Sequence, residues 1–454
     1  MVRQNFLLVG NGAREHAIAA TVCKNKNVRF FAYMDAKNPG IAALCELSGG
    51  EYAIGNICNA AEIAEYAKSR DISLAFSSPD ATLEAGVSDA LIQRGVTCAS
   101  PTRAASQIEW DKSFARDLMQ RYSIPGNPKF KVCTTTEEAF SFIDSLGGNV
   151  AVKPSGLTGG KGVKVVGVQL NGPEDAKAYV QEIFDKEIGG IKSVIIEQKL
   201  SGEEFTLQAF SDGITLYPMP LVQDHKLAFE GDTGPNTGGM GSYSDSNHLL
   251  PFISKEEYEY AVSIMQKTIQ ALRSEKNSFV GVLYGQFMAT PTTINLVEFN
   301  ARFGDPEALN VLAVLNGDLY SIFESMAHGK LQNTAFSFEK KATVCKYLVP
   351  KGYPEKSESD QPIRIDWNCV YNTGAKLYFA SVYEKDNIIY TRKSRSIGVL
   401  AVADSIAKAE KSAEWACSCV SGPLRHRADI GTQELINKKI ARMNRLRSLK
   451  EESI

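Results

Sequence analysis

The first hundred residues alternate between short apolar segments and amphipathic helical segments, and this alternation limits the possible folds more than any other feature. Strands are predicted over residues 6–9, 28–34, 72–77 and 96–98, and helices over 14–23, 60–70 and 82–94. Asn59 stands where the N-cap of the second helix belongs. Because strands separated by helices pair in parallel, we expect a doubly wound α/β domain over residues 1–101.

The rest of the chain is predicted to form two more domains, since 454 residues are too many for one compact core. Residues 102–330 form a longer α/β region, with a Gly-rich flap at about 125–195 and an acidic strand near its end. Residues 331–454 form a smaller β-rich domain. It contains a polar loop at 351–362, strands at 376–383 and 387–391, and helices over 406–418 and in the basic tail.

Charge and cysteine usage exclude several classes of function. Fifty basic and fifty-two acidic residues give a net charge of −2, which provides no general field for nucleic acid or an anionic membrane. No apolar run is long enough to span a bilayer. Nine scattered cysteines with no paired framework predict reduced thiols in a cytoplasmic protein. A monomer acting on small molecules is expected.

The first Gly-rich loop, Gly10-Asn11-Gly12, follows a predicted strand and opens a helix, where main-chain N–H groups can hold an anion. A dinucleotide-binding fingerprint needs a third glycine at position 15, where this chain has Glu15. Two other interpretations remain open for this loop. It either binds a dinucleotide in spite of that residue, or it is a turn that lets the strand and helix pack.

A second Gly-rich loop runs from Lys153 to Val163 (KPSGLTGGKGV). It is not a Walker A loop, because three residues rather than four separate Gly156 from Gly160 and a glycine follows Lys161. Lys153 is predicted to project from the end of a strand. A fixed lysine beside mobile glycines is suited to closing over a triphosphate.

The segment NLVEFNARFGDPE, residues 295–307, carries the most informative polar pattern. Side chains alternate along a strand, so Glu298, Asn300 and Arg302 are expected on one face with Leu296. The opposite face would be apolar: Val297, Phe299 and Ala301. A carboxylate beside an amide oxygen suits a hard cation that also bridges phosphate oxygens, and a guanidinium can clamp a carboxylate or phosphate.

Two other polar stretches are candidates for binding. Residues 197–206 (EQKLSGEEFT) follow an apolar strand and form a predicted hinge between strands. Residues 223–241 form a polar loop that is too rich in glycine for a core and typical of a binding loop. His225 lies in this loop, and a lone histidine is more often structural than catalytic.

Taken in order, these motifs resemble the glycinamide ribonucleotide synthetase family of ATP-grasp ligases. The resemblance rests on GNGAREHA, KPSGLTGGKGV, EQKLSGEEFT, QDHK with DTGPNTGGMG, and EFNARFGDPE. It implies the ATP-dependent ligation of glycine to 5-phosphoribosylamine through glycyl phosphate, a step of purine biosynthesis. A related ATP-grasp ligase that joins a different amine and amino acid is the alternative. The complete set of Lys153, Glu298 and Asn300 argues against a nucleotide-binding regulatory protein without turnover. The missing glycine at Glu15 counts against a nicotinamide oxidoreductase.

The resemblance also implies roles for individual residues. ATP would be held by Lys112, Lys153, Gly159, Gly160, Lys161, Gly162, Glu197, Leu200 and Glu204, with Glu197 at the adenine hinge and Glu204 at the ribose. Mg²⁺ or Mn²⁺ would be held by Glu298 and Asn300, and Lys153 and Arg302 would be catalytic. Glycine and phosphoribosylamine would meet Gly10, Asn11, Gly12, Arg14, Pro79, Asp80, Asp224, His225, Lys226, Asn236, Thr237, Gly238, Gly239 and Arg302.

The chain departs from the family at four places. Ser77-Ser78-Pro79-Asp80 replaces an expected Val-Gly-Pro-Glu, and Gly12-Ala13 replaces a pair of glycines. A basic segment, residues 392–398, stands where a Gly-Gly-Arg-Val turn is expected. Gln286 occupies a position where a small residue is common, as a third metal ligand or as a spacer.

Overall fold

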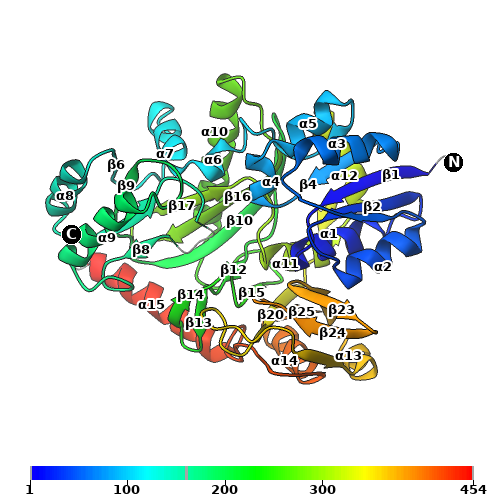
Figure 1. Ribbon diagram of the computed structural model, residues 1–454. Helices are drawn as coiled ribbons and strands as arrows, with labels where there is room; N and C mark the ends of the chain where they lie inside the picture. The colour runs from blue at the N-terminus through cyan, green and yellow to red at the C-terminus, as the bar shows by residue number, and fades with distance from the viewer. Residues whose placement is uncertain (1–2, 159–161, 452–454) are drawn as a thin grey trace.

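The protein, seen as a computed structural model, is described over residues 3–158 and 162–451 (Figure 1). Its N-terminal part contains a five-stranded sheet in the order β3-β2-β1-β4-β5, with every pairing parallel. The strands are β1 (Gln4–Val9), β2 (Val28–Met34), β3 (Tyr52–Ile54), β4 (Leu74–Ser77) and β5 (Thr97–Cys98). The predicted doubly wound α/β fold is confirmed.

Alternate residues of the central strand β1 enter two different cores. Phe6 and Leu8 face α1 (Ala13–Val22) and α2 (Pro39–Ser48), whereas Leu7 and Val9 face α3 (Ala60–Ser69) and α5 (Val87–Gln93). Helix α12 (Leu319–Ala327), from far along the chain, covers the first face as well. Its Phe323 stacks on Phe76 of β4 at a centroid separation of 4.4 Å.

The sequence prediction omitted α2 and β3 and merged two helices into one. Helix α2 has clear end signals: Asn38 caps it by accepting from the N–H of Gly40 and Ile41, Pro39 is its first residue, and Gly49 ends it in the left-handed conformation. The predicted helix over 82–94 is α4 (Asp80–Glu84) followed by α5, because Gly86 at φ 75° interrupts it.

The middle of the chain forms two four-stranded sheets. The smaller lobe has the order β6-β9-β7-β8, from β6 (Phe130–Cys133), β9 (Val194–Gln198), β7 (Val150–Pro154) and β8 (Lys164–Val165), with α8 (Thr136–Ser145) and α9 (Pro173–Asp185). The larger sheet has the order β11-β10-β16-β17, from β11 (Leu216–Pro218), β10 (Glu203–Asp212), β16 (Val280–Ala289) and β17 (Ile294–Asn300). Helices α6 (Gln107–Trp110), α7 (Lys112–Arg121) and α10 (Lys255–Ser274) belong to this middle region.

The C-terminal region is built on an antiparallel sheet that includes two strands from the middle of the chain. Its order is β12-β15-β20-β25-β22, from β12 (Gln223–Asp224), β15 (Gly241–Ser244), β20 (Ala342–Pro350), β25 (Ile397–Ala403) and β22 (Lys376–Phe379). The hairpin β13 (Leu227–Phe229) and β14 (Thr233–Asn236) lies between the first two. The polar loop of residues 223–241 is therefore held at the junction of two regions.

A second small sheet completes the C-terminal region in the order β23-β24-β21-β26, from β23 (Val382–Lys385), β24 (Ile388–Thr391), β21 (Pro362–Ile365) and β26 (Val420–Ser421). The predicted single strand over 376–383 is divided between this sheet and β22, because the chain changes sheets at residues 380–381. The helices are α13 (Trp367–Thr373), α14 (Ile406–Ser418) and α15 (Gln433–Glu451).

The prediction that the cysteines are reduced thiols is wrong for one pair. Cys369 and Cys419 form a disulfide between α13 and the end of α14. The other seven cysteines are free. Among the residues described, no helix is both long and apolar enough to cross a membrane.

Candidate active site

The predicted carboxylate strand is β17, and its polar side chains lie together as expected. The Arg302 guanidinium donates to Asn300 Oδ1 at 2.9 Å. Burial opposes the ionisation of Glu298, but the positive charges of Lys226 and Lys112 outweigh it and hold the pKa of this carboxyl below its usual value. Glu298 is therefore an anion in a positively charged setting.

The alternation on this strand differs from the prediction because β17 contains a bulge. Gln286 is opposite Glu298 and the next residue, Phe287, is opposite Leu296, so Val297 is the extra residue. Leu296 and Phe299 both enter the core, and Leu296 does not share the face of Glu298. The bulge leaves the Val297 carbonyl unpaired in the sheet, where it accepts from Lys153 Nζ at 2.9 Å and from Arg116 at 2.8 Å.

The structure brings Lys153 and Glu197 together at the same point. Lys153 Nζ lies 2.8 Å from a Glu197 carboxylate oxygen, and both residues are buried. Arg116 of α7 forms two further bonds to this carboxylate, at 2.7 and 3.0 Å. Arg116 was not identified from the sequence, because only the fold places α7 beside β9. Glu197 thus ties the smaller lobe to α7 through its side chain.

The structure describes the two ends of the Gly-rich loop in the predicted flap, residues 153–158 and 162–163. Lys112, the first residue of α7, donates to the Gly156 carbonyl at 3.0 Å. Gly162 is fixed by Tyr179 of α9, whose hydroxyl donates to its carbonyl at 2.7 Å. Leu200 lies in the connection between β9 and β10. Gly159, Gly160 and Lys161 lie outside the described residues.

A cluster of polar side chains gathers on β10, β12 and β16, next to the carboxylate strand. Buried Gln286 donates to Glu204 at 2.7 Å and to Asp224 at 3.4 Å, and Lys226 lies 3.7 Å from Glu204. Burial, with the charges of Glu307 and Glu204, raises the pKa of Asp224 to about 6, although Lys226 opposes this. Gln286 therefore orients two carboxylates through its amide nitrogen.

His225 is turned away from this cluster. Its Nδ1 lies 3.4 Å from Asp232, a carboxylate that also pairs with Arg427 at 2.9 Å and Lys439 at 2.5 Å. Burial lowers the pKa of His225 in spite of Asp232, so the ring is neutral. Alternation along the strand explains why Asp224 and Lys226 face one side and His225 the other.

The first Gly-rich loop holds the carboxylate of its own Glu15. This carboxylate accepts from the Gly12 N–H at 2.6 Å, from Arg14 Nε at 2.5 Å and from the Ser78 hydroxyl at 2.6 Å. Glu15 thus occupies part of the anion site at the start of α1, which disfavours dinucleotide binding. Ser78, one of the departures from the family, is accounted for by this internal bond.

Arg14 connects the N-terminal domain to the segment that follows β17, and the charge of Asp80 acts on the same place. Arg14 donates to the Phe303 carbonyl at 3.0 Å. Arg302 lies 3.0 Å from buried Glu109, whose other oxygen accepts from the Ala301 N–H at 2.8 Å. Burial raises the pKa of Glu109 to about 7, whereas the Arg302 charge lowers it and the Asp80 charge raises it. Glu109 was not identified from the sequence.

The loop of Asn236, Thr237, Gly238 and Gly239 is fixed by an arginine that the sequence analysis did not select. Arg395 donates to the carbonyls of Gly238, Gly239 and Asp305, at 2.8, 3.1 and 2.9 Å. It also pairs with the Asp305 carboxylate at 3.2 Å and lies over the Tyr347 ring. Arg395 belongs to the basic segment, residues 392–398, that replaces the expected Gly-Gly-Arg-Val turn. This segment therefore also contains an arginine, and that arginine has a structural role.

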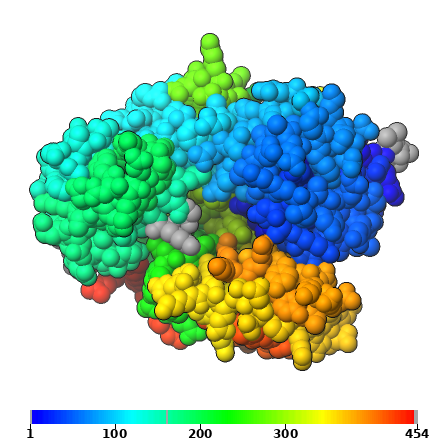
Figure 2. All heavy atoms as spheres, in the orientation of Figure 1, coloured from blue at the N-terminus to red at the C-terminus, as the bar shows by residue number. Residues whose placement is uncertain are grey.

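These elements face one another where the lobes of the molecule meet. Figure 2 shows the surface hollowed between the blue N-terminal lobe, the green smaller lobe and the yellow and orange C-terminal region. No group of three or more His, Cys, Asp and Glu side chains is arranged as a metal site within the described part of the chain.

Comparison with known proteins matches three family models in order along the chain. They are the phosphoribosylglycinamide synthetase N domain at residues 4–109, its ATP-grasp (A) domain at 110–308 and its C domain at 343–433. Curated relatives named phosphoribosylamine–glycine ligase include those of Methanosarcina barkeri and Methanopyrus kandleri, 49% and 47% identical. Each alignment covers 97% of this chain and 99% of the relative.

Solved structures agree with the fold. A phosphoribosylamine–glycine ligase from Thermotoga maritima has a TM-score of 0.77 at 23% identity, covering 94% of this chain and 99% of its own. A biotin carboxylase domain from Hydrogenobacter thermophilus 2-oxoglutarate carboxylase, solved with MgADP, has a TM-score of 0.73 at 15% identity, covering 97% and 94%. With three family models in order and near-full-length relatives above 45% identity, the chain belongs to the phosphoribosylglycinamide synthetase family.

Proposed function

We propose that this protein ligates glycine to 5-phosphoribosylamine at the expense of ATP, giving glycinamide ribonucleotide, ADP and phosphate. The observation that carries the proposal is the contact between Lys153 and the bulged strand of Glu298 and Asn300. It joins a phosphate-binding lysine to a candidate metal site. The family membership supports the choice of substrates.

In this proposal ATP lies between the smaller lobe and the larger sheet. Lys112, Lys153 and the flap residues Gly159–Gly162 hold the phosphates, Glu197 and Leu200 line the adenine hinge, and Glu204 meets the ribose. The Glu197 side chain is already committed to Lys153 and Arg116, so an adenine contact at this position uses its main chain.

The donor set of β17 fits Mg²⁺ or Mn²⁺. Glu298 and Asn300 offer hard oxygen ligands, and the pKa of Glu298 is held low, so it is ionised at neutral pH. The bound ion would supply charge neutralisation of the phosphoryl oxygens. Gln286 is proposed to orient carboxylates beside this site, because its nitrogen donates to Glu204 and Asp224 and Tyr284 donates to its oxygen.

Glycine and phosphoribosylamine are proposed to occupy the junction of Gly10–Arg14, Pro79, Asp80, Asp224–Lys226, Asn236–Gly239 and Arg302. A glycine carboxylate oxygen attacks the γ-phosphorus, the bond to the β-phosphate oxygen breaks, and ADP leaves. The amine nitrogen then attacks the carbonyl carbon of glycyl phosphate, phosphate leaves, and the nitrogen loses a proton. Lys153 and Arg302 lower the barrier by positioning and by neutralising charge, and no protein nucleophile is needed.

ADP release with glycine and freshly generated phosphoribosylamine tests the proposal against a panel of other amines and amino acids. The expected result is that this pair gives by far the highest kcat/KM. A different preferred amine would favour the related-ligase alternative. If no pair of amine and amino acid supported ADP release, the ligase assignment itself would be contradicted.

A further inference from the structure

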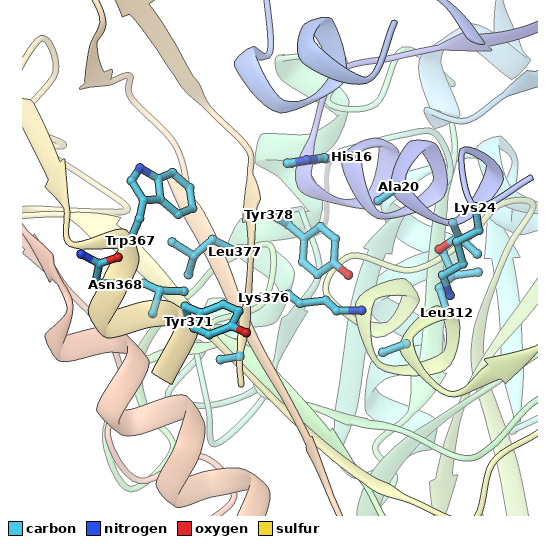
Figure 3. A pocket seen from close by; sticks show the side chains of 14 residues that line it. His16, Ala20, Lys24, Leu312, Trp367, Asn368, Tyr371, Lys376, Leu377 and Tyr378 are labelled. Carbon is cyan, nitrogen blue, oxygen red and sulfur yellow. The ribbon is translucent and has the colours of Figure 1, made fainter. Parts of the chain in front are cut away.

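A second cavity lies at the contact between the N-terminal domain and the C-terminal region, apart from the candidate active site. It has a volume of about 630 Å³, within the range of about 300–1,000 Å³ typical of small-molecule sites. Its walls come from α1, α11 (Glu307–Ala313), α13 and β22 (Figure 3). None of the residues assigned above to ATP, metal, glycine or phosphoribosylamine lines it.

Two lysines face this cavity from opposite walls, Lys24 after α1 and Lys376 at the start of β22. Neither has an ion pair or a side-chain hydrogen bond with the described residues. Burial lowers the pKa of Lys24, and the charge of Lys376 lowers it further, while Glu339 opposes them. The two ammonium groups therefore repel each other, and an anion between them would relieve that repulsion.

Aromatic rings form the rest of the rim. Trp367 and Tyr371 of α13 are 56% and 85% exposed. Buried Tyr378 forms the inner wall, with its ring against His16 at 5.5 Å. Figure 3 shows the hydroxyl groups of Tyr371 and Tyr378 and the Lys376 side chain directed to the same side of α13, toward Lys24.

This combination defines the ligand by its chemistry. Exposed aromatic rings stack on flat heterocycles. Unpaired ammonium groups bind phosphate or carboxylate. We propose that the cavity between α1 and α13 is a second binding site, which takes a small ligand with both a flat ring and an anionic group, such as a nucleoside monophosphate.

The test uses the full chain with its ATP site saturated by Mg²⁺ and a non-hydrolysable ATP analogue. Calorimetric titration with AMP, adenosine and inorganic phosphate separates the ring from the charge. One AMP is expected to bind per chain in addition to the ATP analogue. Adenosine and inorganic phosphate are expected to bind at least about tenfold more weakly than AMP. Trp367→Phe should remove the change in tryptophan fluorescence that accompanies AMP binding.

The matched variants are the double change Lys24→Gln with Lys376→Gln, and the control Lys385→Gln on the exposed strand β23. The double variant should weaken AMP binding at least about tenfold, while the control should bind as the wild type does. Ligase turnover at saturating substrates should be unchanged in both. The proposal is overturned if the wild type binds no AMP once its ATP site is filled, or if all variants bind AMP equally.

Discussion

At the scale of single residues, the site depends on side chains whose positions are fixed by specific partners. Lys153 is held by Glu197 and the Val297 carbonyl, and Arg302 by Glu109 and Asn300. Such contacts orient charged groups before a substrate arrives, as the proposed mechanism without a protein nucleophile requires.

Glu298→Gln is expected to remove most ADP formation and leave the fold intact. The change deletes the charge of the proposed metal ligand and barely alters its volume, so kcat should fall about a hundredfold or more while the melting temperature stays close to that of the wild type. Steady-state kinetics over a range of Mg²⁺ concentrations measure this, with Glu46→Gln on the exposed side of α2 as the control. Wild-type turnover at limiting Mg²⁺ would refute the metal assignment.

Arg395→Lys should damage the proposed binding site for phosphoribosylamine and glycine and spare the proposed ATP site. A lysine cannot reproduce three carbonyl bonds and an ion pair from one planar group, so the loop of Gly238 and Gly239 loses its anchor. KM for phosphoribosylamine or glycine is expected to rise about tenfold, with KM for ATP unchanged. Arg392→Lys, three residues earlier and exposed, is the control. If KM for ATP rose as much as KM for phosphoribosylamine or glycine, Arg395 would act only on the stability of the protein.

At the scale of elements, helix α15 packs the C-terminal part of the chain against the larger sheet. Its Lys439 and Arg442 pair with buried Glu203 of β10, at 3.2 and 2.9 Å. The sequence places Ile440, Met443, Leu446 and Leu449 at helical spacing. Met443 is fully buried and Ile440 and Leu446 pack against the same core, whereas Leu449 is 52% exposed. Lys439 and Arg442 therefore have partners on the larger sheet.

Met443→Ala should lower the free energy of unfolding by about 2–5 kcal/mol, because it leaves a cavity under α15. Urea denaturation followed by circular dichroism measures the change. Arg445→Ala, on the exposed side of the same helix, should shift the free energy by less than about 0.5 kcal/mol. If the two variants were equally stable, α15 would not be packed as described.

At the scale of the whole molecule, the N-terminal domain and the C-terminal region are locked together by buried polar contacts. His16 Nδ1 accepts from the Phe379 N–H at 2.9 Å, and Asn38 donates to the Phe379 and Asn11 carbonyls at 2.7 and 2.9 Å. Burial lowers the pKa of His16 to about 4. The interface therefore requires a neutral imidazole.

This pKa predicts an acid-sensitive interface. Unfolded His16 binds a proton below its ordinary pKa of 6.5, whereas folded His16 does not until about pH 4, so stability falls as the pH drops from 6.5 to 4. The loss should be on the order of a few kcal/mol by pH 4. Unfolding measured by urea between pH 7.5 and 4.5 should show a smaller pH dependence in His16→Asn than in the wild type. His328→Asn, on an exposed helix end, should match the wild type.

The sequence by itself determined the parallel N-terminal sheet, the polar pattern of Glu298, Asn300 and Arg302, and the family. These depend on local periodicity and on the order of short motifs, which are properties of neighbouring residues. It could not give the bulge at Val297, because a bulge is defined only by register against β16. Nor could it give Arg116, Glu109 and Arg395, each of which is tens of residues or more from its partner. Only the tertiary structure decides those contacts, since burial makes an unpaired charge costly and so selects the partner across the fold.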